Sequence, residues 1–324
     1  MYTSDELLEA INQYLAHLSY ERKPQSIYEP IKYVLELGGK RIRPVLMLLA
    51  YQMFKDNPTS ILSSACALET YHNYTLLHDD LMDNAPLRRG KTTVHEKWNA
   101  NQAILSGDSM LVMAYERLAQ CDVKHLKAAL DLFTETALQI GEGQQYDMEF
   151  EQRCDVSVEE YIEMIRLKTS VLLACAMKLG GMLADAPIED TENLYKFGEC
   201  IGLAFQLQDD YLDVYGDPQI FGKQVGGDIL CNKKTYMLIT AFNRANENQR
   251  RELLEWIEKT EYDNDEKIAA ITKLYSEIGV DQLAKEKIYA YFEESKKYLA
   301  AINVPQEKKA ELESYSDNMM KRNK

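Results

Sequence analysis

Apolar residues follow the helical repeat along almost the whole of this 324-residue chain. Leu7, Ile11 and Leu15, for example, lie four positions apart and therefore share one face of a helix. The alternation of apolar and polar residues that is typical of strands is hardly seen. The sequence therefore predicts an all-α fold, and because no repeat or linker divides the chain, we expect one domain over residues 1–324.

Short local signals mark where helices begin and end. Gly38-Gly39 interrupts the apolar pattern, as glycine pairs do between helices. Ser157 followed by Glu160 predicts a capping box that opens a long helix. A second helix start is expected at Gly107, with Asp108 as its cap.

The charge of the chain argues against a nucleic-acid partner. Aspartate and glutamate number 52 against 37 lysines and arginines, a formal net charge of −15, and such a chain repels a polyanion. The six cysteines are scattered and form no metal-binding spacing. Because the first ten residues are acidic and no apolar run is long enough for a transmembrane segment, we expect a cytoplasmic protein.

Two short segments gather carboxylates among apolar residues. Each holds three aspartates within five positions, so that the first and last share a helix face. The six residues are Asp79, Asp80, Asp83, Asp209, Asp210 and Asp213. Like charges at this spacing repel one another and need a cation, and carboxylate oxygens suit magnesium, which also coordinates phosphate.

A solvent-exposed acidic face is the simpler interpretation of one such cluster in an acidic chain. The flanking residues favour burial instead: Leu77 and Leu81 surround the first cluster, and Leu207 and Leu212 the second. If the two helices face each other across a bundle cavity, six carboxylates would hold several magnesium ions and leave positions for a diphosphate.

Basic residues gather in two segments that contain no acid. Residues 38–44 read GGKRIRP, and residues 87–91 read LRRGK and follow the first acidic cluster. An ordinary basic loop would explain either segment alone, but their position favours anion binding. His72 lies two helical turns before Asp79 on the same face. Weaker candidate anion contacts are Lys168, Thr169, Lys223 and Lys233.

Taken in order, these segments resemble the trans-type isoprenyl diphosphate synthases, also called polyprenyl synthetases. The shared motifs are GGKRIRP, HDDLMD, GQQYD, FQLQDDYLD and GDILCNKKT. Each motif is short, but the ordered set is specific. The resemblance implies a single polyprenyl synthetase domain over residues 1–324, built as an all-α helical bundle around a deep central cavity and working as a homodimer.

The resemblance also implies roles for individual residues. The six aspartates and Lys168 would carry the catalysis, and the aspartates would hold two to three Mg²⁺ ions that bridge the allylic diphosphate. The residues that would bind isopentenyl diphosphate are Lys40, Arg43, His72 and Arg89. Those around the allylic substrate, which is dimethylallyl, geranyl or farnesyl diphosphate, would be Arg88, Lys168, Thr169, Gln206, Lys223 and Lys233, with Gln144 and Asp147 lining the same cavity.

The reaction implied is a head-to-tail condensation. Magnesium stabilises the diphosphate leaving group, the double bond of isopentenyl diphosphate attacks the allylic cation, and the departing diphosphate is the expected base. Product length depends on how far the growing allylic chain can extend before it meets a bulky side chain on the helix that carries the first aspartate cluster. Tyr74 precedes Asp79 by five positions and Thr75 is the small residue beside it, an arrangement that resembles synthases of short products. We expect geranylgeranyl diphosphate, with farnesyl diphosphate as the next choice.

Other functions remain open at this point. A terpene cyclase or a squalene-type synthase would share the fold and the first cluster, but it would not need GGKRIRP. A noncatalytic subunit of a prenyl synthase would be expected to lose some of the six aspartates. A helical scaffold with surface acids would bind no diphosphate in the presence of magnesium.

Overall fold

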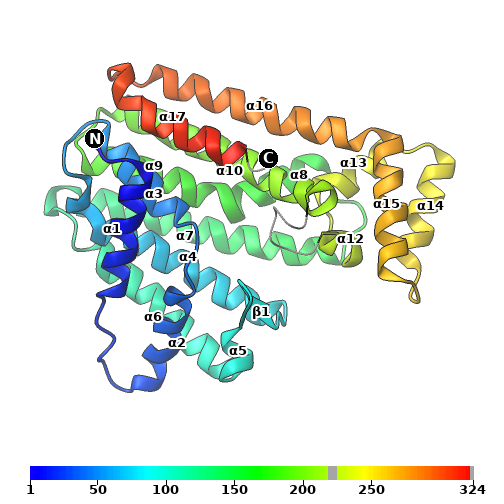
Figure 1. The fold of residues 1–324 in the computed structure, drawn as a ribbon, viewed down its shortest axis with the longest axis horizontal. Coiled ribbons are helices and arrows are strands. Elements are labelled where there is room, and N and C mark those ends of the chain that lie inside the picture. The colour runs from blue at the N-terminus through cyan, green and yellow to red at the C-terminus, as the bar shows by residue number, and fades with distance from the viewer. Residues whose placement is uncertain (218–224, 322–324) are drawn as a thin grey trace. The chain divides into compact units, whose positions relative to one another are not determined.

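The computed structural model describes residues 1–217 and 225–321, which are mostly helical (Figure 1). The all-α prediction is confirmed. The chain divides into two compact units. The first unit consists of residues 1–134, 175–194 and 303–312, and the second of residues 135–174, 195–302 and 313–324.

The first unit is a set of helices with one short hairpin. Its elements are α1 (Ser4–Ala16), α2 (Gln25–Glu36), α3 (Ile42–Gln52), η1 (Pro58–Ile61), α4 (Leu62–Met82), β1 (Leu87–Arg88), β2 (Lys91–Thr92), α5 (Val94–Lys97) and α6 (Ala100–Leu118). Figure 1 shows α4 and α6 running side by side, with the hairpin following the end of α4. Leu7, Ile11 and Leu15 are buried on α1, as their spacing predicts.

The second unit has its own helices, and some helices have residues in both units. Those shared are α7 (Val123–Glu151), α9 (Val171–Leu183), α10 (Ile188–Tyr215) and α17 (Gln306–Met320). Those of the second unit alone are α8 (Val158–Ile165), η2 (Arg166–Ser170), α12 (Gly227–Leu230), α13 (Tyr236–Arg244), α14 (Glu247–Glu258), α15 (Asn264–Ile278) and α16 (Val280–Ala301).

The predicted capping box is confirmed, and the predicted break at Gly107 is wrong. Ser157 accepts a hydrogen bond from the backbone of Glu160, whose side chain accepts one from the backbone of Ser157. The chain then continues through one π-helical turn, η2, into α9. By contrast, α6 runs straight through Gly107, because this glycine makes room for the ring of His78 on α4.

The hairpin between β1 and β2 is an element that the apolar pattern did not predict. Leu87 pairs with Thr92, and Arg88 pairs with Lys91. The two turn residues, Arg89 and Gly90, have φ values of 52° and 72°, which suits a tight hairpin turn. The turn sets the basic segment against the end of α4.

Helix α10 approaches η2 and the start of α9 closely along one stripe of its surface. A Cβ atom on Gly198 would lie 2.8 Å from the Cα atom of Ala174, and one on Gly202 would lie 2.6 Å from that of Ser170. The same four-residue spacing continues to Gln206 and Asp210, so the glycine contact directs these two polar residues toward η2.

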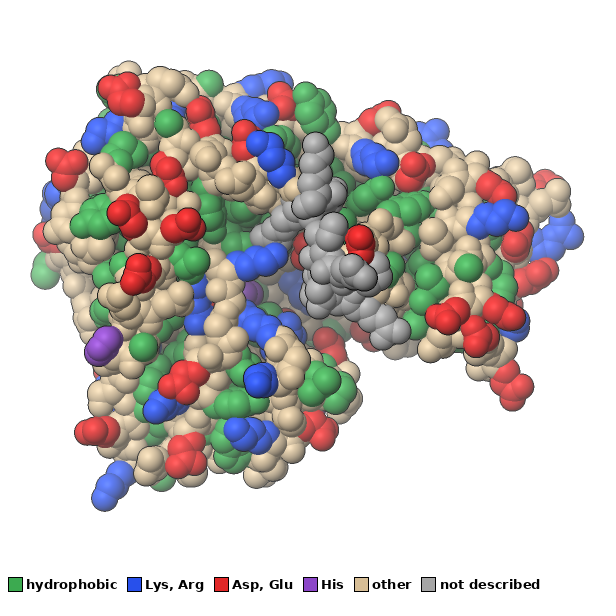
Figure 2. Space-filling model, viewed as in Figure 1, with side chains coloured by type: hydrophobic (Ala, Val, Ile, Leu, Met, Phe, Trp, Pro, Cys, Tyr) green, Lys and Arg blue, Asp and Glu red, His purple; other side chains and the backbone are tan. Residues whose placement is uncertain are grey.

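The distribution of surface charge and the apolar content of the helices concern two possible partners, nucleic acid and membrane. Figure 2 shows acidic and basic side chains interspersed over the face that it presents. The absence of a nucleic-acid partner stays a prediction. Among helices in residues 1–217 and 225–321, none has the long apolar run that crossing a lipid bilayer requires.

We predict that two glycines of α7 respond oppositely to alanine. A Cβ on Gly143 would overlap the backbone nitrogen of Lys168, whereas one on Gly141 meets no atom within 4 Å. Gly143→Ala should therefore lower the free energy of unfolding by about 1–3 kcal/mol. Gly141→Ala should raise it by about 0.5–1 kcal/mol, because alanine favours the helix. Urea denaturation measures both, and equal changes would contradict the close approach of α7 and η2.

Candidate functional site

Helix α4 carries the first acidic cluster at its carboxyl end. Asp79 and Asp80 lie in its last turn, and Asp83 is the residue that ends it. Asp80 is only 5% exposed and accepts hydrogen bonds from Arg88, with Nε to Oδ1 at 2.9 Å and Nη2 to Oδ1 at 2.5 Å. The guanidinium fork compensates this buried carboxylate. Arg88, predicted to lie near the allylic substrate, thus contacts an aspartate of the first cluster.

In the GGKRIRP segment the structure separates a structural arginine from a candidate ligand-binding one. Arg41 is 4% exposed, and its Nη1 lies 2.7 Å from Glu69 Oε1 on α4, so it anchors the segment. Sequence reasoning did not single it out. Arg43, which was predicted to bind isopentenyl diphosphate, has a buried Nε with no hydrogen-bond acceptor among the described residues. Burial, reinforced by Arg89 and opposed by Glu69, lowers the pKa of Arg43 to about 10.

The double glycine before this segment accommodates a second predicted arginine. Arg89 donates a hydrogen bond from Nη1 to the carbonyl oxygen of Gly38. A Cβ atom on Gly39 would lie 2.8 Å from Arg89 Cζ, and Gly39 has φ 133°, so only glycine fits there. Lys40 follows directly and is exposed.

His72 completes this group in the first unit. Its pKa is held well below the usual 6.5 by burial first, and then by the positive charges of Arg43, Arg89 and Arg88. The imidazole is therefore neutral and surrounded by cations. Three of the four residues predicted to bind isopentenyl diphosphate thus belong to one group of positive potential that suits an anion.

The residues predicted to set product length lie in an aromatic layer of the first unit. The ring of Tyr74 is 4.8 Å from that of His78 and 5.4 Å from that of Tyr71, centre to centre. Tyr71 in turn meets Phe133 at 5.2 Å. Thr75 donates from Oγ1 to the carbonyl of His72 at 2.9 Å. The role of Tyr74 and Thr75 in product length stays a prediction.

In the second unit, two predicted lysines meet one carboxylate. Lys168 Nζ lies 2.6 Å from Asp147 Oδ2, and Lys233 Nζ lies 3.9 Å from the same oxygen. Burial alone would raise the pKa of Asp147, but the charges of Lys233 and Lys168 outweigh it and the pKa is lowered. Gln144 precedes Asp147 by one turn on α7. The structure therefore brings together residues from α7, η2 and the end of α12.

Asp210 of the second acidic cluster is buried within a hydrogen-bonded chain. Thr169 Oγ1 donates to Gln206 Oε1 at 3.1 Å, and Gln206 Nε2 donates to Asp210 Oδ1 at 3.1 Å. Tyr161, which sequence reasoning missed, donates its hydroxyl to the other oxygen of Asp210. No sequence signal marks this tyrosine, because it reads as an apolar residue of α8.

The charge of Asp210 is only partly compensated. Burial first, and then the negative charge of Asp228, raise the pKa of Asp210 to about 7. The hydrogen bonds from Tyr161 and Gln206 and the charge of Lys233 oppose this rise. An added cation would favour the ionised carboxylate, so the donor set fits a metal ion on electrostatic grounds.

The other aspartates of the second cluster lie along the same helix. Asp213 Oδ2 accepts a hydrogen bond from the backbone nitrogen of Asp228 at 2.9 Å, so it holds the start of α12. Asp209 lies one turn earlier on α10. Lys223, also predicted to bind the allylic substrate, lies outside the described residues.

A ready-made metal centre is not found in the described part of the chain. No three His, Cys, Asp or Glu side chains converge there closely enough to hold one metal ion. Magnesium commonly completes its six ligands with waters and substrate phosphates, so fewer protein carboxylates suffice.

Comparison with known proteins supplies independent information. A family model described as polyprenyl synthetase matches residues 24–275. A short chain isoprenyl diphosphate synthase of Methanocaldococcus jannaschii is 41% identical over 250 residues, 77% of this chain and 76% of that protein. A geranylgeranyl diphosphate synthase of Methanosarcina mazei is 38% identical over 280 residues, 86% of this chain and 84% of that protein.

A solved structure agrees over the full length of the chain. The crystal structure of a geranylgeranyl pyrophosphate synthase superimposes with a TM-score of 0.94 at 40% sequence identity and covers 100% of both chains. The observed fold is therefore that of an isoprenyl diphosphate synthase.

We predict that His72 makes stability fall at mildly acidic pH. Because the folded chain holds His72 neutral, only the unfolded chain gains this proton below pH 6.5. Between pH 6.5 and about pH 5.5, wild type should lose about 1 kcal/mol more unfolding free energy than His72→Gln. Urea unfolding at both pH values measures this. His17→Gln, at an exposed histidine, should behave as wild type; equal losses in wild type and His72→Gln would contradict a neutral His72.

Proposed function

Because the chain belongs to the polyprenyl synthetase family, we propose that it condenses isopentenyl diphosphate with an allylic diphosphate, head to tail, to a short-chain product. It is a trans-prenyltransferase, a short-chain isoprenyl diphosphate synthase. The observation that carries the proposed residue roles is that predicted cations meet aspartates within each unit: Arg88 meets Asp80 in the first, and Lys168 and Lys233 meet Asp147 in the second.

Isopentenyl diphosphate would be bound by the arginine group of the first unit. Arg43 offers an Nε without an acceptor in the described structure, and Arg89 lies beside Gly39. Neutral His72 would donate a hydrogen bond to the diphosphate from its single N–H group, without gaining a second proton. Lys40 in the same loop would add a further charge.

The allylic diphosphate would be bound by the lysines of the second unit. Lys168 and Lys233 converge on Asp147 and would both reach diphosphate oxygens. Thr169, Gln144 and Gln206 would line this part of the site, with Arg88 and Lys223 as the remaining predicted contacts. Tyr161 and Gln206 keep Asp210 oriented by their hydrogen bonds.

Two to three Mg²⁺ ions would be held by the two aspartate clusters. When bound, magnesium supplies the positive charge that stabilises the diphosphate as it leaves. Lys168 and Lys233 stabilise the same developing charge, since both donate hydrogen bonds from ammonium groups. The departing diphosphate accepts the proton from the condensed product, so no side chain is needed as general base.

Geranylgeranyl diphosphate is the product that we favour, with farnesyl diphosphate as the next choice. Tyr74 is a bulky, half-buried residue five positions before Asp79. Its ring packs against Tyr71, which in turn packs against Phe133. An allylic chain that reaches Tyr74 would meet this aromatic layer and stop growing.

The proposed assembly is a homodimer in the cytoplasm. Helix α6 exposes Ile104, Leu105 and Val112, which are 43%, 53% and 67% exposed, and an apolar face of this kind suits a second copy. None of the six cysteines, all of which lie in the described residues, forms a disulfide, which supports a reducing compartment. The family model spans residues of both units, which supports a single domain over residues 1–324.

We predict that elongation requires both magnesium and the second aspartate cluster. Purified protein would be incubated with radiolabelled isopentenyl diphosphate and each allylic primer, with magnesium or with a chelator, and the products sized. Linear diphosphates should form only with magnesium. Asp209→Asn should lower kcat by about 100-fold or more, since it removes a carboxylate that would hold the magnesium whose charge stabilises the leaving group.

The matched control is Asp131→Asn, which changes an exposed aspartate on α7 and should leave turnover unchanged. Cyclic or diphosphate-free products would instead indicate a terpene cyclase or squalene-type synthase. No turnover by wild type with any primer would indicate a noncatalytic subunit or a scaffold.

We predict that Tyr74→Ala lengthens the product. Removing the ring opens space between the allylic chain and Tyr71, so the main product should gain at least one isoprene unit. Chromatography of the dephosphorylated products measures this. Tyr146→Ala, at an exposed tyrosine of α7, is the control. Unchanged product length in Tyr74→Ala would contradict the proposal that Tyr74 limits the growth of the allylic chain.

A further inference from the structure

A lysine in the second unit is buried without a carboxylate partner. Lys267 on α15 is 0% exposed. Its Nζ donates to Asn232 Oδ1 at 2.8 Å and lies 4.3 Å from the centre of the Tyr262 ring. Among the residues that the structure describes, none of the acids lies within ion-pairing distance of it. Burying an ammonium group in this way is costly, so its retention needs a reason.

The partner of Lys267 is Asn232, the residue that follows the C-cap of α12. Asn232 has φ 52°, in the left-handed region, and its backbone nitrogen donates to Ile229 at 3.2 Å. The next nitrogen, that of Lys233, donates to the carbonyl of Asp228 at 2.9 Å. This pair of hydrogen bonds is a Schellman cap. The conformation of Asn232 therefore decides the direction in which Lys233 leaves the helix.

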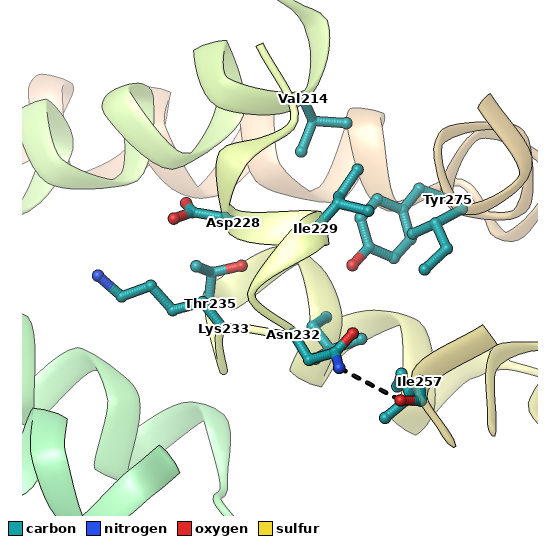
Figure 3. Close-up of a pocket in the computed structure, with 10 residues that line it drawn as sticks. Val214, Asp228, Ile229, Asn232, Lys233, Thr235, Ile257 and Tyr275 are labelled. Atoms are coloured by element: carbon teal, nitrogen blue, oxygen red, sulfur yellow. Dashed lines mark hydrogen bonds between the residues drawn. The ribbon is translucent and has the colours of Figure 1, made fainter. Parts of the chain in front are cut away.

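The side chain of Asn232 is held from both of its ends. Its Oδ1 accepts from Lys267, and its Nδ2 donates to the carbonyl of Ile257 at 3.3 Å. The charged donor fixes which end of the amide is oxygen, because an ammonium group can only donate. Figure 3 shows Asn232 directed at Ile257, while Lys233 extends to the opposite side together with Asp228.

The position of Lys233 matters for the second-unit site. Its Nζ is 3.9 Å from Asp147 Oδ2, the oxygen that also binds Lys168. We propose that Lys267 is a positioning residue: through Asn232 it fixes the cap of α12 and thereby places the Lys233 ammonium for the allylic diphosphate. This inference rests on the proposed function only for the identity of the substrate.

Three variants test the link. Lys267→Met keeps the length of the side chain and removes the ammonium. Asn232→Gly keeps the left-handed backbone and removes the amide, so it tests the same link if Lys267→Met fails to fold. Lys273→Met removes an exposed lysine from the same helix and is the matched control.

Lys267→Met and Asn232→Gly should each raise KM for the allylic diphosphate about fivefold, while KM for isopentenyl diphosphate changes less than about twofold. Lys273→Met should match wild type. In a Lys233→Met background, Lys267→Met should add less than about twofold, because the two lysines act in series.

If Lys267 had only a structural role, Lys267→Met would lower the unfolding midpoint and leave the ratio of the two KM values, allylic diphosphate to isopentenyl diphosphate, unchanged. That result, or an equal KM increase with and without Lys233, would overturn the proposal. The proposed function is tested separately by wild-type turnover. If wild type elongates no primer, calorimetric binding of inorganic pyrophosphate with magnesium replaces KM, and the same pattern of variants is expected in Kd.

Discussion

Charge compensation within an apolar helical interior governs how this chain is built. Several buried or half-buried carboxylates have a cation at hydrogen-bond distance; for example, Glu69 has Arg41, Asp80 has Arg88, and Asp147 has Lys168. Two of the predicted site residues depart from this pattern. Asp210 is held mainly by neutral donors, and Arg43 keeps an Nε without an acceptor in the described structure. These two departures have opposite sign, and they are the places that suit a cation and an anion, respectively.

The predicted substrate contacts divide between the units. Residues expected to bind isopentenyl diphosphate all belong to the first unit, and those described around the allylic substrate, except Arg88, belong to the second. Each group is organised by close backbone contact. Gly39 admits the guanidinium of Arg89, and Gly143 and Gly202 let two helices approach η2. The glycines of the motifs therefore serve packing as well as local flexibility.

Sequence reasoning identified much of this and failed at definable points. Helical periodicity, the cap at Ser157 and both aspartate clusters could be read directly, because they depend on local spacing. The structural role of Arg41, as opposed to the ligand-binding role proposed for Arg43, could not be predicted from the sequence, since it depends on a buried glutamate on another helix. The cap at Asp108 was wrong because Gly107 serves a contact with His78, and Tyr161 gave no signal because burial of its hydroxyl depends on tertiary packing.

The π-helical turn η2 has a consequence for the way this chain tolerates insertions and deletions. Lys168 and Thr169 are neighbours in this turn, yet one binds α7 through Asp147 and the other binds α10 through Gln206. A π turn contains one residue more than an α-helical turn. Deleting one residue here would restore regular α-helical geometry and keep the flanking helices close to their present orientation, but it would leave one residue fewer to carry the two contacts. Both contacts would not survive together, so the length of this segment is set by the two helices it must touch at once.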